Sequence, residues 1–134
     1  MTAHLDPVVV MVRTLLANTA INTQVSGRIY GGSIPQGASA PLILVRSVAR
    51  RPTTRPTTQW WDMATVIDVQ STEPSESFQI AAAVEDAVNA VVGSQPEGVV
   101  ASCEVTGSSS IEDGAYTPVR YRTVLTVEVT ARNN

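Results

Sequence analysis

Few side chains in this sequence are of types that carry chemistry, and they do not form a catalytic set. The chain contains a single histidine, His4, and a single cysteine, Cys103. Nucleophilic catalysis needs a base beside its nucleophile, and a zinc site needs several His or Cys ligands. His4 lies in a terminal segment that we expect to fray, and Cys103 falls among the apolar residues of a predicted strand, where a thiol is inert. We therefore expect no enzymatic activity, no cofactor and no metal site.

Two other groups of residues are of types that bind ligands, but neither has the spacing of a known binding motif. Adjacent carboxylates, Glu112 and Asp113, fall in a predicted polar loop over residues 107–114 and could bind a hard cation, but the spacing of an EF-hand loop is missing. Solvation explains them better. Three glycines that could approach a phosphate lie close together in another predicted loop: Gly31, Gly32 and Gly37. Their spacing matches neither GxGxxG nor GxxxxGK[ST], so phosphate binding is not indicated.

A segment rich in Arg, Pro and Thr at residues 50–59 is the most distinctive stretch of the chain. Arg-Pro-Thr-Thr occurs there twice in tandem, and the segment carries Arg50, Arg51 and Arg55. Its prolines restrict the backbone to extended conformations, which predicts a long hairpin tip or arm. The arm is either a solvated loop or a contact for a partner. Because no aromatic residue lies between the arginines to stack on bases, a protein partner is favoured over nucleic acid.

Composition limits the classes of protein that the chain can represent. It has 134 residues, a net charge of -3 and nine basic residues, all of them Arg. One domain covering residues 1–134 is expected at this length, and an acidic balance does not favour nucleic acid or anionic membranes as partners. The apolar run Val8–Val12 is too short to cross a bilayer and has no basic segment before it. We expect a soluble protein made in the cytoplasm.

The elements that position these residues centre on a strand followed by a helix. Residues 60–71 alternate between apolar and polar side chains, with Asp68 and Gln70 in the polar set, and predict a strand buried on one face. Residues 75–92 place apolar side chains at helical spacing after Pro74, which suits the first turn of a helix. An earlier helix is predicted at residues 8–16, with Asp6 as its cap.

The remaining segments predict further strands. One short strand is expected within residues 28–38, and longer strands at residues 42–49, 99–106 and 118–131. The prediction is an α+β fold: a mostly antiparallel sheet of about four long strands, with two helices packed on one face. Its opposite face should be mainly polar.

Apolar residues away from the predicted core suggest contacts between subunits. Trp60 lies on the outer face of its strand, and Phe78 lies outside the apolar stripe of its helix. Several such residues together favour oligomerisation. The candidate protein-interface residues are Arg50, Arg51, Arg55, Trp60, Phe78, Glu112 and Asp113.

Most of the chain resembles the tail terminator, or tail-completion, proteins of long-tailed bacteriophages. The resemblance rests, in order, on segments at residues 15–17, 25–30, 34–38, 40–43, 60–69 and 78–92. The arm at residues 50–59 is longer and more distinctive than this family requires.

The resemblance implies an α+β subunit of a sixfold ring at the head-proximal end of the tail. Such a ring stops polymerisation of the tail-tube protein and presents a surface to the head-tail connector, while genomic DNA passes through it without specific binding. The protein would be assembled in the host cytoplasm and located in the virion, with no membrane contact. A ring protein of the phage neck that completes the head is the nearest alternative, and a non-viral oligomeric binding module is another.

Overall fold

The computed structural model describes residues 5–52 and 60–133, and its centre is the predicted strand-to-helix unit. Strand β3 (Trp60–Ser71) is followed by helix α3 (Pro74–Ala87) and by a short 3-10 helix, η1 (Val88–Val91). Pro74 lies in the first turn of α3, where its missing N–H removes no helical hydrogen bond. The predicted helix over residues 75–92 is therefore present, with its last turn tightened.

The N-terminal helix is also present and is followed by a second helix that the pattern did not indicate. Helix α1 (Pro7–Ala17) begins at the predicted cap, where the Asp6 carboxylate accepts a hydrogen bond of 2.9 Å from the backbone N–H of Val8. Asn18 ends α1 and caps α2 (Thr19–Gln24), since its side chain accepts a hydrogen bond of 3.2 Å from the N–H of Ile21. Six residues are too few to show helical periodicity.

The sheet has six strands, whereas four long strands and one short strand were predicted. Its order is β1-β2-β3-β6-β5-β4, and only β1 and β2 run parallel. The four long strands are present, and two short strands lie at the edges of the sheet, which is mixed. The strands other than β3 are β1 (Ile29–Gly31), β2 (Leu42–Pro52), β4 (Gly93–Gln95), β5 (Gly98–Asp113) and β6 (Arg120–Asn133).

Residues 107–113 and 50–52, which were predicted as irregular, are strand. The loop predicted at residues 107–114 continues β5 as far as Asp113, because β6 supplies hydrogen-bonding partners along that whole length. The arm predicted at residues 50–59 begins as strand, since Arg50, Arg51 and Pro52 pair with β3. The rest of the arm, including Arg55, lies outside the described residues.

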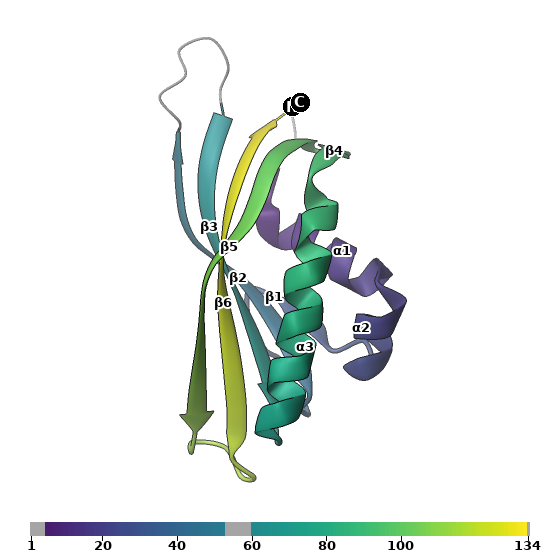
Figure 1. Ribbon diagram of the computed structural model, residues 1–134, viewed down its shortest axis with the longest axis vertical. Coiled ribbons are helices and arrows are strands. Elements are labelled where there is room, and N and C mark those ends of the chain that lie inside the picture. The colour runs from purple at the N-terminus through teal and green to yellow at the C-terminus, as the bar shows by residue number, and fades with distance from the viewer. Residues whose placement is uncertain (1–4, 53–59, 134) are drawn as a thin grey trace.

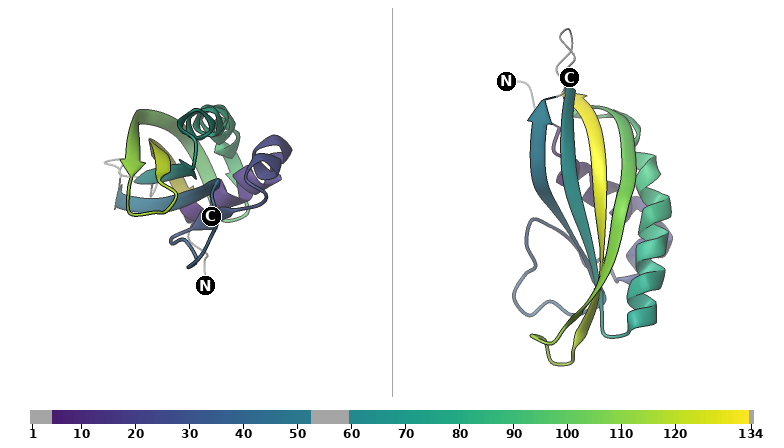
Figure 2. Two further views of the ribbon diagram at one scale, coloured as in Figure 1. Left: turned by 90° about the horizontal axis from the view of Figure 1, so that it is seen from below. Right: turned by 60° about the vertical axis from the view of Figure 1, so that its left-hand side comes forward.

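The main core lies between the helices and one face of the sheet. Figure 1 shows α1, α2 and α3 on the same side of a strongly twisted sheet, and the second view of Figure 2 shows the long strands side by side. Leu15, Ile67, Ile80, Val84 and Val127 are all fully buried there. The two predicted helices thus pack on one face, joined by the short α2.

The sheet face away from the helices is here called the open face. Part of it is buried, and that part includes apolar residues. Leu42, Leu44, Asp68 and Gln70 share this face at one end of the sheet, and each is at most 8% exposed. The segment at residues 32–41, between β1 and β2, contacts this end of the sheet, where Arg120 donates to the backbone carbonyl of Ala38. The prediction of an exposed polar set on β3 is therefore wrong for Asp68 and Gln70.

Candidate interaction surfaces

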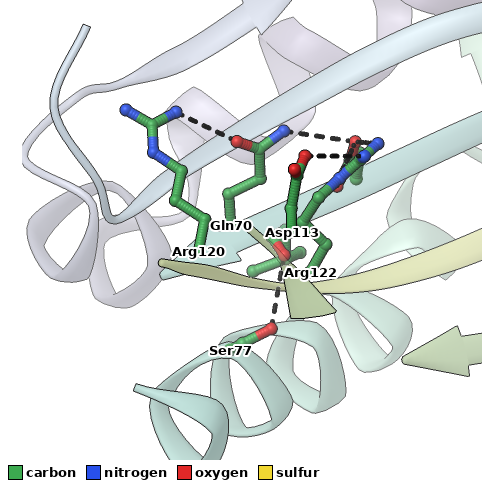
Figure 3. A network of polar contacts seen from close by, with 7 residues as sticks. Gln70, Ser77, Asp113, Arg120 and Arg122 are labelled. Atoms are coloured by element: carbon green, nitrogen blue, oxygen red, sulfur yellow. Dashed lines mark hydrogen bonds and ion pairs between the residues drawn. The ribbon is translucent and has the colours of Figure 1, made fainter. Parts of the chain in front are cut away.

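The buried end of the open face contains a network of charged and amide groups, drawn in Figure 3. Arg122 of β6 donates from Nε to both carboxylate oxygens of Asp68, at 3.2 and 3.1 Å, and a second nitrogen of its guanidinium also binds that carboxylate. The Asp68 side chain is 1% exposed and that of Arg122 is 25% exposed. Arg122 also lies 3.4 Å from the Asp113 carboxylate of β5. The hydrogen bond to Asp68 is the largest cause of a raised pKa for Arg122.

The same network joins the segment at residues 32–41, between β1 and β2, to the sheet. Gln70 donates to Asp68 at 3.3 Å and accepts from Arg120 at 3.0 Å. Arg120 also donates to the backbone carbonyl of Ala38 at 2.6 Å, and its guanidinium lies 3.9 Å from the centre of the Tyr116 ring. These contacts join β3, β6 and two connecting segments. Each buried charge in this network has a partner, so none bears the cost of burial alone.

Sequence reasoning missed this network, although its components were visible. Asp68 and Gln70 alternate along one strand, and Arg120 and Arg122 alternate along another with the same period. The register that places Gln70 opposite Arg122 and Asp68 opposite Val124 is needed before their contacts can be inferred.

The predicted cationic residues lie at the upper end of the sheet in Figure 1, where β2 ends and β3 begins. Arg50 and Arg51 are exposed, and the Arg50 guanidinium lies 3.9 Å from the centre of the Trp61 ring. Trp60 is half-buried, and the Arg132 guanidinium lies 5.6 Å from its ring centre. Arg50, Arg51 and Trp60 are therefore close in the fold, at the end where the arm leaves the sheet.

The predicted acidic residues lie at the opposite, lower end of the sheet. Glu112 is exposed at the end of β5, whereas Asp113 already contacts Arg122 and accepts a hydrogen bond of 3.0 Å from the N–H of Ala115. Arg51 lies opposite Asp62 of β3, and Glu112 is level with Ser71 of β3. These two positions of β3 are nine residues apart, which corresponds to about 30 Å. Arg51 and Glu112 therefore do not meet within one subunit.

Two apolar features lie on the helix side of the subunit. Phe78 is 62% exposed on α3, as its position outside the apolar stripe predicted. A groove of about 670 Å³ runs along α1 and is lined by Val8, Val9, Val12, Leu16 and Ser47 together with neighbouring residues. Val9 and Leu16 are 49% and 39% exposed there. The groove adjoins β2 and was not predicted from the sequence.

Cys103 is buried, and the acidic side chains of the described residues are not grouped as metal ligands. Cys103 is 7% exposed, and burial raises the pKa of its thiol to about 11, so the thiol is neutral at physiological pH. Within residues 5–52 and 60–133, no group of three or more His, Cys, Asp or Glu side chains is placed to hold a metal ion. Among the same residues, none of the helices is long and apolar enough to span a bilayer.

Comparison with known proteins agrees with this architecture. The fold is similar to that of a chain in a solved structure described as the virion of a native gene transfer agent particle, with a TM-score of 0.69 and 18% sequence identity over 90% of both chains. No curated protein gives a significant match. The same fold thus occurs in a gene transfer agent particle.

Residues 9–131 match the model of a protein family described as tail completion protein gp17. The match extends from α1 into β6, so the chain belongs to this family of bacteriophage tail completion proteins. It is a virion structural protein with a tail-completion role.

Proposed function

We propose that the protein is a ring-forming tail terminator, which caps the tail tube, stops its polymerisation and provides the joint to the head-tail connector. The family match over residues 9–131 carries this proposal, because it covers nearly all of the fold described here. The family role is structural, and this supports assembly rather than catalysis as the function.

The proposed partners follow from that role. Six copies form the ring, its tube-facing surface binds the tail-tube protein, and its other surface binds the connector. Genomic DNA passes through the ring without specific binding, which is compatible with a net charge of -3. Assembly takes place in the host cytoplasm, and the mature location is the head-proximal end of the tail.

The unequal edges of the sheet support a ring. β1 and β2 lie at one edge of the sheet and β5 and β4 at the other, so the two lateral surfaces of a subunit differ. Two different surfaces that bind each other give a head-to-tail contact, and such contacts close into rings when the rotation permits.

The arm at residues 50–59 is a candidate contact within the ring or between the ring and the tube. Arg50 and Arg51 are exposed at its base. Exposed charges are screened over about 8 Å at physiological ionic strength, so a contact made by these arginines should weaken with salt. Its acidic partner is a neighbouring subunit or the tube.

Sedimentation of the purified protein, alone and mixed with assembled tail tubes, tests the proposal. A tail terminator should sediment as a ring of six and should cosediment with tubes and block the addition of further tube protein. A neck protein should form a ring that leaves tube growth unchanged. A chain that stays monomeric at all concentrations and ignores tubes would refute the proposal.

A further inference from the structure

The long strands at the two sides of the sheet each have a stretch of edge that is not paired by another described strand. On β2, pairing with β1 ends at Val45, so the outer edge is open from Arg46. On β5, pairing with β4 ends at Val100, so the outer edge is open from Ala101. Natural proteins usually protect such edges, because unpaired N–H and C=O groups readily accept another strand.

The two open stretches lie at the same level of the sheet. Residues directly opposite one another across the four long strands define these levels. Arg46, Val66, Thr126 and Gly107 form one level, and Arg51, Asp62, Thr130 and Ser102 form another. The open edge at residues 46–51 of β2 is thus level with residues 102–107 of β5.

The open edges carry opposite charges on the open face. Arg46 and Arg51 are exposed and have no ion-pair partner among the described residues. On the other side of the subunit, Glu104 lies directly opposite Glu128, and both are exposed. Like charges directly opposite each other on neighbouring strands are destabilising, so this pair favours the approach of a cation.

Glu104 lies at a level between the two arginines. Ala49, Ala64, Glu128 and Glu104 form one level across the sheet. If β5 of one copy lay beside β2 of another at unchanged level, Glu104 would face Ala49 and lie diagonally between Arg46 and Arg51. Diagonal neighbours in antiparallel strands are about 7–8 Å apart, within reach of a long side chain.

We propose that neighbouring subunits of the ring join through these two edges, with residues 102–107 of β5 pairing antiparallel with residues 46–51 of β2 in the next copy. This inference rests on the proposed ring and identifies its subunit contact. A cyclic ring has no translation along its axis, so strands that run along that axis keep their levels from one copy to the next.

The proposed pairing is limited to residues 102–107 of β5 and 46–51 of β2, here called the window, because a short strand occupies the neighbouring part of each edge. β4 occupies the edge of β5 above it, and β1 occupies the edge of β2 below it. A bulge between Val105 and Gly107 lies near the lower end of the window. Bulges bend a strand, which allows the lower half of β5 to leave the partner where β1 begins.

A charge swap tests the contact. Glu104→Arg should raise the concentration needed for half-maximal ring assembly at least tenfold, since like charges at an interface oppose binding. The melting temperature of this variant as a monomer should not fall, because the introduced guanidinium would face the Glu128 carboxylate across the strands. Asp86→Arg, the same change of charge on an exposed residue of α3, is the matched control and should assemble normally.

The complementary variant carries Arg46→Glu with Arg51→Gln and should also fail to assemble alone. Mixing it with the Glu104→Arg protein should restore rings in which the two variants alternate, because each interface then joins opposite charges. Such rings close only with an even number of subunits, which six satisfies.

Disulfide trapping gives an independent readout. Ala49→Cys with Glu104→Cys, in a chain with Cys103→Ser, should form covalent oligomers up to the closed ring under oxidation. Residues 49 and 104 of one subunit are three strand spacings apart, about 14 Å, too far for an internal disulfide. A wild-type protein that never forms rings would refute the proposed function. Wild-type rings with a Glu104→Arg variant that assembles normally, or with no trapped oligomers, would instead refute this contact alone.

Discussion

Replacing Arg122 with Met should destabilise the subunit strongly, because it leaves the Asp68 carboxylate buried without its cation. Arg122 makes three hydrogen bonds to a carboxylate that is 1% exposed, and only Gln70 would remain as a side-chain donor to it. Breaking a buried ion pair by removing one partner costs about 3–5 kcal/mol, against a total stability of about 5–15 kcal/mol. For a domain of this size the corresponding fall in melting temperature is roughly 10–20 °C.

Urea unfolding followed by the fluorescence of Trp60 and Trp61 measures the effect at one fixed protein concentration. Asp68→Asn combined with Arg122→Met removes the unpaired charge and should recover part of the loss, so the two changes should not be additive. Arg13→Met is the control, since Arg13 is 41% exposed and pairs with Glu97 at the surface, where an ion pair contributes little. If Arg122→Met unfolds at the same urea concentration as the wild type, the network does not stabilise the fold.

The other predictions concern the core, a buried hydroxyl, the thiol and the arm. Val84→Asp places an unpaired charge at a fully buried position of α3 and should leave the subunit unfolded by circular dichroism; a native melting curve would refute the packing of that face. Thr65→Val should raise stability by about 1 kcal/mol in urea, because the fully buried Thr65 hydroxyl has no hydrogen-bond partner among the described residues; a loss of stability would show that this hydroxyl is satisfied. The pKa of Cys103 is raised by burial to about 11, so the folded state retains the thiol proton while the unfolded state loses it, and stability should fall as pH rises from 9 to 11. Cys103→Ser should remove this component of the pH dependence, and an unchanged dependence would contradict it. Replacing Arg50, Arg51 and Arg55 together with Ser should spare the fold but weaken ring formation or tube binding in sedimentation, and normal binding across a salt titration would identify the arm as a solvated loop.

Much of the fold could be predicted because its central elements have strong local signals. Residues 60–71 alternate clearly, and α1 has both a capping Asp6 and a helix-starting Pro7. The second half of β5 could not be predicted, because Gly107–Asp113 carries no apolar alternation and is held as strand by β6. The residues of β4 and α2 are too few to show a period.

The candidate surfaces were less predictable because they depend on pairing between distant segments. The exposure of Phe78 followed from helical periodicity alone. The partner of Asp113, by contrast, is Arg122, and this contact depends on how β5 and β6 are aligned. The open edges of β2 and β5 depend on where two short strands stop. Such features need the register of the whole sheet.

Tail length in a phage that lacks this protein tests the central claim most directly. Electron microscopy of lysates from the deletion, with and without the wild-type protein supplied in trans, gives the length distribution. A tail terminator predicts overlong or unjoined tails in the deletion and a return to one length on complementation. Tails of normal length with unstable heads would contradict the account and identify a neck protein instead.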